Sequence, residues 1–171
     1  MIRKSRLALL PLALAACGGA ATAADLSLSL EIPQLPVAEY HRPYVAIWVE
    51  DGSQAIAANL AVWYQVRGDH TKWLPDLRQW WRRGGRDLKV PVDGLTGATR
   101  PVGQHLLKFD ATQAPLAGLK PGQYSLVVEA VREVGGREAL RLPFEWPIKA
   151  ARREAAKGTK ELGAVALTLN P

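Results

Sequence analysis

Short apolar segments alternate with turn-forming residues along most of the chain, and this spacing limits the folds that it can adopt. Residues 26–32 (LSLSLEI) alternate apolar and polar side chains at the period of a half-buried β-strand. Gly, Pro and Asp-Gly signals recur about every 8–12 residues, which suits many short strands better than a helical bundle. Strands are expected at residues 26–32, 42–51, 57–66, 104–109, 123–133, 138–146 and 163–169.

The size of the chain allows one ordinary domain with a packed core. It has 171 residues, of which 48% are hydrophobic. Residues 42–51 and 57–66 are expected to form a hairpin, and Trp48 and Trp63, which lie in them, are expected in the core. The sequence therefore predicts an all-β fold: one immunoglobulin-like antiparallel β-sandwich of about seven or eight strands at residues 25–171.

Three segments depart from the strand pattern. Residues 72–83 (KWLPDLRQWWRR) place apolar side chains three and four apart, which predicts one short helix packed on the sandwich. Residues 90–103 are rich in Pro and Gly, which predicts a loop. Residues 150–157 are short and basic, and we expect a helical excursion there.

The N-terminus has the order of an export signal. A basic start is followed by the apolar run LALLPLALAA and then by small residues, so residues 1–24 are expected to direct secretion to the periplasm. Two cleavage sites compete: Ala-Thr-Ala at 21–23 would release a soluble protein, whereas a lipobox at 14–17 would end the signal at residue 16 and leave Cys17 lipid-modified. No later apolar run is long enough to span a bilayer, so no transmembrane segment is expected in the mature chain.

Composition argues against several functional classes. With a single Cys and 3 His residues, a disulfide framework or a Cys/His metal cage is not expected. Without residues 1–24, the chain has 19 Lys and Arg against 16 Asp and Glu, and its basic clusters at 82–86 and 152–153 are short, so nucleic-acid binding is not expected. The sequence contains no nucleophile elbow, HExxH motif, Walker loop or dinucleotide-binding glycine motif, so no catalytic residue is assigned.

Residues 93–99 (DGLTGAT) are the one segment that indicates chemistry. They resemble the target motif of bacterial flavin transferases: Asp, a small residue, a variable residue, Ser or Thr, Gly, Ala and an acceptor Thr. Every position matches, and the resemblance implies that a transferase joins FMN, taken from FAD, to Thr99 through a phosphoester. Asp93 and Thr96 belong to the matched motif, and Asp93 is expected to contact the transferase or to brace the turn. The alternative interpretation is an ordinary surface turn.

The composition of the motif suits such a transfer on physical grounds. An acceptor that enters the active site of another enzyme needs small neighbours and a pliable backbone, which Gly94, Gly97 and Ala98 supply. The hydroxyl of Thr99 accepts the phosphoryl group, while positioning and a metal ion in the transferase do the rest. The target therefore needs no catalytic group of its own.

The resemblance extends beyond the motif. Segments at 42–51, 72–81, 96–103 and 124–136 are similar to one uncharacterised bacterial family of predicted periplasmic proteins, over about residues 25–148. Members of that family occur with PepSY-type membrane reductases and flavin transferases. The resemblance implies a periplasmic electron carrier.

One position departs from the family pattern. Members often have a His in the stretch that reads REVGG here, where this chain has Val134. If that His tunes the flavin, the tuning is absent in this chain or comes from His41, His70 or His105.

A flavin attached at Thr99 needs a surface for its ring and a partner for its phosphate. Trp73, Trp80 and Trp81 precede the motif closely, and one of them would stack on the ring, with Trp80 and Trp81 as our candidates. Core packing is the alternative role for tryptophans at this spacing. Arg100 follows the acceptor and would pair with the phosphate, the alternative being a solvated arginine.

The sequence thus predicts a periplasmic module that carries FMN on Thr99 and relays electrons from a PepSY-type membrane reductase to another periplasmic redox partner. We expect such a carrier to act as a redox partner more than as a stand-alone enzyme, because the cofactor supplies the chemistry. Two alternatives remain open: a cofactor-free immunoglobulin-like binding or scaffold protein, and a flavin-dependent reductase that acts on a small substrate.

Overall fold

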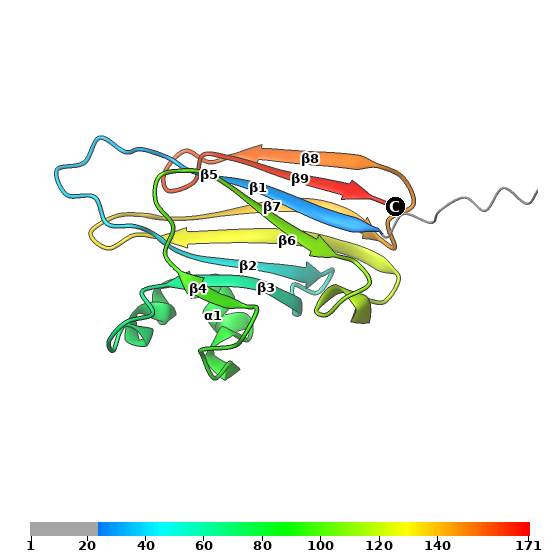
Figure 1. Cartoon of the computed structure of the whole chain (residues 1–171), viewed down its shortest axis with the longest axis horizontal. Helices are drawn as coiled ribbons and strands as arrows, with labels where there is room; N and C mark the ends of the chain where they lie inside the picture. Colours follow the sequence, from blue (N-terminus) through cyan, green and yellow to red (C-terminus); the bar gives the residue numbers. More distant parts are fainter. Residues whose placement is uncertain (1–23) are drawn as a thin grey trace, which may run out of the picture.

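Two β-sheets pack face to face in the computed structural model, which describes residues 24–171 (Figure 1). One sheet has the strand order β5-β1-β9-β8 and the other β4-β3-β2-β6-β7. Neighbouring strands are antiparallel except β3 and β4, which are parallel. The strands are β1 (Asp25–Ile32), β2 (Tyr44–Asp51), β3 (Ile56–Tyr64), β4 (Thr96–Ala98), β5 (Gly103–Asp110), β6 (Gly122–Val131), β7 (Arg137–Trp146), β8 (Arg152–Lys157) and β9 (Ala164–Asn170).

The predicted all-β sandwich is confirmed, with nine strands in the described part of the chain instead of seven or eight. The expected hairpin of β2 and β3 is present. The expected helical character of residues 150–157 is wrong, because this segment is the edge strand β8, paired with β9. Its Arg, Glu, Ala and Lys residues favour helices in isolation, but pairing with β9 outweighs that preference. The charged residues also suit an exposed edge.

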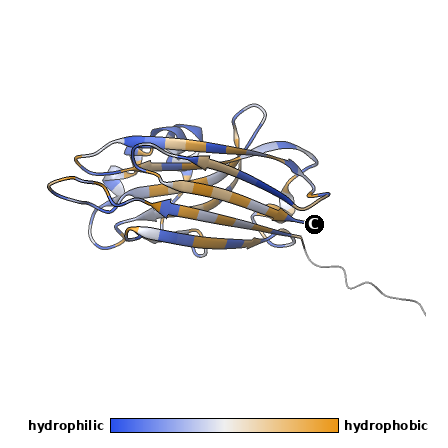
Figure 2. Ribbon diagram, turned by 90° about the horizontal axis from the view of Figure 1, so that it is seen from above, coloured by the Kyte–Doolittle hydropathy of each residue, from blue (hydrophilic) through white to orange (hydrophobic). Residues whose placement is uncertain are grey.

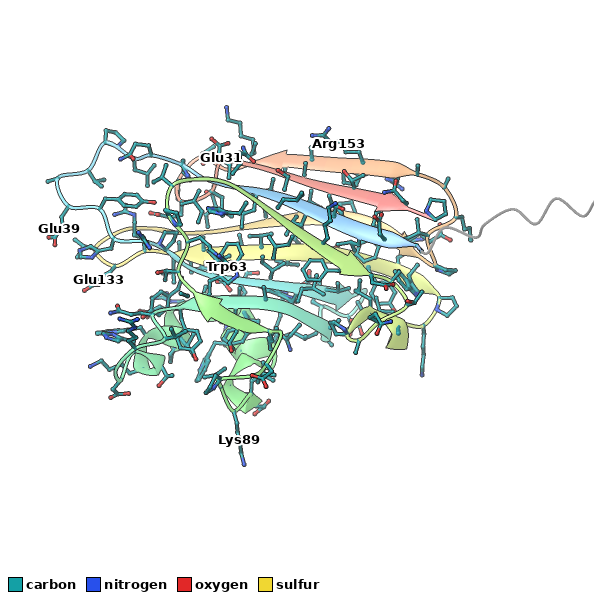
Figure 3. All side chains as sticks on the ribbon, in the orientation of Figure 1. Glu31, Glu39, Trp63, Lys89, Glu133 and Arg153 are labelled. Carbon is teal, nitrogen blue, oxygen red and sulfur yellow. The ribbon has the colours of Figure 1, made fainter. Side chains whose placement is uncertain are left out.

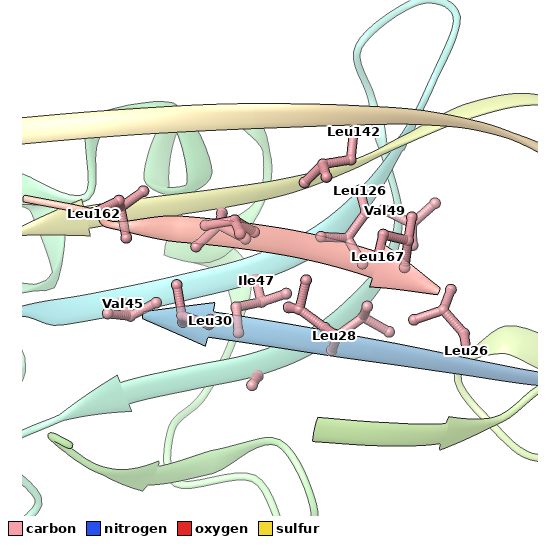
Figure 4. Packing of buried hydrophobic residues seen from close by; sticks show 14 of the residues in the cluster. Leu26, Leu28, Leu30, Val45, Ile47, Val49, Leu126, Leu142, Leu162 and Leu167 are labelled. Atoms are coloured by element: carbon pink, nitrogen blue, oxygen red, sulfur yellow. The ribbon is translucent and has the colours of Figure 1, made fainter. Parts of the chain in front are cut away.

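The main core lies between the two sheets and follows from the alternation in β1. Leu26, Leu28, Leu30 and Ile32 point inward and are at most 1% exposed, while the residues between them lie at the surface of the sheet. Inward-facing residues of β2, β6 and β9 meet them (Figure 4). Hydrophobic and hydrophilic bands alternate along the strands seen from above (Figure 2).

The inner strands of the five-stranded sheet, β2, β3 and β6, are buried on both faces. The outer face of these strands packs against a helical segment formed by η1 (Thr71–Asp76), α1 (Arg78–Arg83) and η2 (Gly85–Asp87). This segment lies below β3 and β4 in Figure 1. Burial on two sides explains why β2 is apolar at almost every position, a pattern that alternation alone does not predict. The side chains at this second interface belong to Ala46, Trp48, Val62, Tyr64, Leu74, Leu77, Trp80 and Val127.

The single helix predicted at residues 72–83 is wrong in detail. The segment is a 3-10 turn followed by a short α-helix, because Leu77 leaves the helical backbone region at φ −73° and ψ 69°. The break lets Leu74, Leu77 and Trp80 all face the sheet, whereas Trp73 is 49% exposed on another side.

Two buried carboxylates attach α1 to the sheet. Glu129 of β6 accepts hydrogen bonds from the backbone N–H groups of Gln79 and Trp80, at 2.9–3.1 Å, and from Arg137 at 3.0 Å. Glu50 of β2 pairs with Arg83 and Arg141. Because charges this buried are stable only when paired, these contacts fix where the helix sits.

The two sheets are joined at one end by a group of polar contacts that we call the inter-sheet clasp: Glu138, Arg132, Glu161 and the backbone of residues 159–162. The Glu138 carboxylate, on β7, accepts four backbone N–H groups from residues 159–162, which connect β8 to β9, at 2.7–3.0 Å. Arg132 and Glu161 form a buried ion pair at 2.9 Å, and the Gly136 N–H also donates to Glu161. The clasp therefore ties the β6–β7 turn to the opposite sheet.

The clasp predicts a pH-dependent stability. Burial raises the pKa of the Glu138 carboxyl, but the four N–H donors outweigh it, so the pKa lies below its ordinary value. Because its pKa is lowered, the ionised Glu138 carboxylate contributes its full stabilisation of the fold above about pH 4.3, the ordinary Glu value. This contribution is lost as the pH falls through the pKa of the folded state. We expect Glu138→Gln to lower the free energy of unfolding at pH 7 by about 2 kcal/mol, with a smaller loss in acid.

Urea denaturation at pH 7 and at lower pH measures this effect. The control is Glu39→Gln, whose carboxylate is 80% exposed, and which should change stability by less than about 0.5 kcal/mol. An equal loss for Glu138→Gln at every pH would contradict the assignment.

Candidate functional site

The motif at residues 93–99 forms a turn followed by the short strand β4. The turn is closed by the Thr96 N–H, which donates to the Val92 carbonyl at 2.9 Å, and Gly94 adopts φ +73°, a conformation that favours glycine. Thr96, Gly97 and Ala98 then pair with the end of β3. Residues 90–103, predicted as a loop, therefore contain one strand at the edge of the five-stranded sheet.

The two threonine hydroxyls of the motif have different surroundings. The Thr96 hydroxyl accepts from the Val92 N–H at 3.1 Å and donates to the Val92 carbonyl at 2.9 Å, so it is used within the turn. The Thr99 side chain is only partly buried, and its hydroxyl has no hydrogen-bond partner among residues 24–171. Of the two, Thr99 is the hydroxyl free to react.

Thr99 lies on the wall of a cavity of about 720 Å³ at one end of the sandwich. Figure 3 labels Glu39 and Glu133, on two of the loops that meet at this end. The β1–β2 loop, the segment after β3 and the β6–β7 turn supply most of the wall. Three sequence-distant segments thus meet beside the motif.

Aromatic and basic side chains dominate this wall. Tyr40, Tyr44 and Trp73 contribute rings, and burial raises the pKa of both tyrosines, which stay protonated at neutral pH. The four arginines of the wall outnumber its two acidic side chains. The acidic residues are Asp76 and Glu133, and the arginines are Arg42, Arg78, Arg132 and Arg137.

The arginines fall into two groups. Arg132 and Arg137 are paired with the carboxylates of Glu161 and Glu129. The guanidinium groups of Arg42 and Arg78 have no hydrogen-bond or ion-pair partner in the described part of the chain. These two side chains can therefore receive an anionic or carbonyl-bearing ligand without breaking an existing contact.

Arg100, expected to pair with a phosphate on Thr99, is directed elsewhere. Its guanidinium lies 5.2 Å from the centre of the Trp63 ring and lines a separate hollow of about 270 Å³. The neighbouring His105 ring also contacts Trp63, edge-on at 5.8 Å, and its Nε2 lies 2.8 Å from the Pro101 carbonyl. These contacts anchor the segment that follows Thr99, and Arg100 is absent from the wall of the larger cavity.

The two tryptophans expected to stack on a flavin, Trp80 and Trp81, lie away from the cavity. Trp80 is fully buried and donates its Nε1–H to Asn59 at 2.8 Å, and Trp81 is partly buried beside it, so neither reaches the cavity. Trp73 does line it. Trp48 and Trp63, predicted in the core, are 0% and 4% exposed, which confirms that placement.

Of the three histidines considered as alternatives for tuning a flavin, two lie at the cavity and one does not. His41 and His70 line the cavity, as does Val134, whereas His105 does not. Val134 is 88% exposed on the β6–β7 turn. Val134, the position at which the resemblance leads us to expect a His, thus lies at the same cavity as Thr99.

Sequence reasoning missed several wall residues: Tyr40, Arg42, Tyr44, Arg78 and Arg132. Each lies within a few residues of an end of an observed strand or helix. Arg42, Tyr44 and Arg132 fall inside predicted strands and Arg78 inside the predicted helix, so no local signal separated them from other strand or helix residues. Only the strand order brings these ends together.

Some predictions concern residues outside the described range. The export signal and the lipidation candidate Cys17 lie in residues 1–23, which the structure does not describe. Within residues 24–171, no helix has the length and apolar character needed to cross a membrane. The same residues contain no group of three or more His, Cys, Asp or Glu side chains arranged to hold a metal ion.

The rim of the cavity carries backbone strain that can be tested. Val134 has φ +52° in a turn closed by the Gly135 N–H and the Arg132 carbonyl at 3.0 Å. A β-branched residue is unfavourable there, by about 1–2 kcal/mol. We expect Val134→Gly to raise the free energy of unfolding by about 1 kcal/mol, since the greater freedom of unfolded glycine offsets part of the gain.

Urea denaturation measures this change in the free energy of unfolding. The control is Val66→Gly, at an exposed valine whose φ is not positive, and it should not stabilise the protein. A loss of stability in Val134→Gly would contradict the assignment of strain to Val134.

Comparison with known proteins identifies a relationship for most of the chain. A family model described as "Predicted periplasmic protein (DUF2271)" matches residues 25–164. No curated protein and no solved structure gives a significant match.

Proposed function

Because the chain belongs to the DUF2271 family of predicted periplasmic proteins, we propose that it is a periplasmic electron-transfer module that carries FMN covalently on Thr99. The expected family is confirmed by the match over residues 25–164. The flavin, the flavin transferase that attaches it and the PepSY-type membrane reductase that reduces it are parts of the proposal.

One observation carries the proposal: the contrast between the two hydroxyls of the motif. Thr96 is held by Val92, whereas the Thr99 hydroxyl is unpaired within the described residues and borders a cavity large enough for a cofactor. A surface turn without this role needs neither feature. Asp93, Gly94 and Ala98 are exposed, so a transferase can reach the motif along the edge strand β4.

The attachment reaction places few demands on this chain. The Thr99 Oγ1 attacks the FMN phosphorus of FAD, the pyrophosphate bond breaks, AMP leaves, and the hydroxyl proton passes to a base of the transferase. The metal ion and the positioning groups belong to the transferase. The chain itself contributes an accessible hydroxyl and a segment fixed by Arg100, Trp63 and His105.

The residues beside Thr99 fit a flavin. The phosphodiester is anionic, and the free guanidinium groups of Arg42 and Arg78 lie on the same wall as Thr99. When bound, the flavin supplies the electron-accepting and electron-donating chemistry. The chain holds the cofactor and limits its contact with water.

Co-expression with a flavin transferase tests the attachment. The intact mass should rise by that of FMN less one water, Thr99→Ser should keep this gain, and Thr99→Ala should abolish it. Thr112→Ala, at an exposed threonine on the turn after β5, is the matched control and should be modified normally. An unchanged mass in the presence of an active transferase would favour the cofactor-free scaffold, and a full gain in Thr99→Ala would place the flavin elsewhere.

The electron-transfer role needs a separate measurement. Membranes that contain a PepSY-type reductase and its electron donor should bleach the visible absorption of the flavin-loaded protein, and a periplasmic acceptor should restore it. A loaded protein that these membranes do not reduce, while dithionite bleaches it, would refute the proposed donor.

A further inference from the structure

The cavity beside Thr99 combines size, position and lining in a way that the neighbouring hollow beside Trp63 does not. We infer that it receives the isoalloxazine ring of the FMN attached at Thr99. This inference rests on the proposed function and adds to it the place and the contacts of the ring.

Position and size select this cavity over the neighbouring hollow. Thr99 lies on its wall, and its volume of about 720 Å³ falls within the range of about 300–1,000 Å³ typical of cofactor sites. The hollow on the Trp63 side has about 270 Å³, is lined by Arg100 and does not include Thr99. A flexible ribityl chain joins the phosphate to the ring, so the ring can lie some way from the acceptor.

The wall offers flat surfaces for an aromatic ring. Tyr44 is held by an edge-on contact with Tyr64 at 6.4 Å and by a hydrogen bond from its hydroxyl to the His70 carbonyl at 3.5 Å. Trp73 is 49% exposed, which is unusual for so large an apolar side chain. A stacked isoalloxazine would cover that exposed surface.

The wall also offers donors that suit the polar edge of a flavin. The carbonyl oxygens and ring nitrogens of isoalloxazine accept hydrogen bonds, and the guanidinium groups of Arg42 and Arg78 make no hydrogen bond or ion pair among residues 24–171. Gln65 adds an amide on the same wall. Stacking surfaces and free donors therefore occur together where the ring would lie.

The test uses flavin-loaded protein whose modification has been verified by intact mass. A ring held against Trp73 and the tyrosines should emit weakly and resist quenching by iodide, and unfolding in urea should restore bright emission. Trp73→Leu should raise the emission of the folded protein severalfold without changing the mass gain. Trp81→Leu, at a tryptophan outside the cavity, is the matched control and should leave the emission low.

The outcomes separate the two proposals. A mass gain with emission and iodide quenching equal to those of the urea-unfolded protein would overturn the cavity and leave the attachment standing. An emission that rises equally in Trp73→Leu and Trp81→Leu would also overturn the contact with Trp73. Because Trp73 is half-exposed, its replacement should leave the fold intact, which far-UV circular dichroism verifies.

A second arm covers the case in which no mass gain occurs. The unmodified protein is then titrated with free FMN. Binding is followed by the quenching of FMN emission. An affinity for FMN that falls by about two- to tenfold in Trp73→Leu, the change expected for one stacking contact, would support the cavity as a flavin site. The double variant Arg42→Gln, Arg78→Gln should also bind FMN more weakly than the unchanged protein in the same titration. The absence of any quenching would overturn the inference.

Discussion

The inter-sheet clasp is the constraint on which the candidate site depends. Glu138 collects four backbone N–H groups from the connection between β8 and β9, and Arg132 is paired with Glu161 of the same connection. Both contacts join the five-stranded sheet to the four-stranded one at the end where the cavity lies. Arg132 also lies 5.8 Å from the Tyr40 ring, so the clasp reaches the β1–β2 loop. The clasp thus connects two parts of the cavity wall, the β6–β7 turn and the β1–β2 loop, to the four-stranded sheet.

The second constraint is the burial of strands β2, β3 and β6 on both faces of the five-stranded sheet. The helical segment is fixed by apolar packing of Leu74, Leu77 and Trp80 and by the carboxylate of Glu129. Its remaining surface carries Trp73 and Arg78 to the cavity. The same sheet holds the motif, because β4 pairs with β3 at its edge. One sheet thus positions the acceptor hydroxyl and part of the wall that faces it.

Local patterns in the sequence predicted the strands well and the site only in part. The alternation in β1 and the turn signals are local, so they identified the sandwich and the motif around Thr99. The strand β8 was missed because its residues favour helices until β9 pairs with them. The roles expected for Trp80 and Arg100 depended on which way each side chain points, and that is decided by packing against Asn59 and Trp63.

The central claim is that the Thr99 hydroxyl carries the flavin. A crystal structure of the protein purified after co-expression with a flavin transferase tests it most directly. The account predicts electron density that continues from the Thr99 Oγ1 into a phosphate and on to a ring in the cavity beside Trp73. Density that begins at Thr96 or at another side chain, or a Thr99 side chain without attached density in protein that contains the flavin, would contradict it.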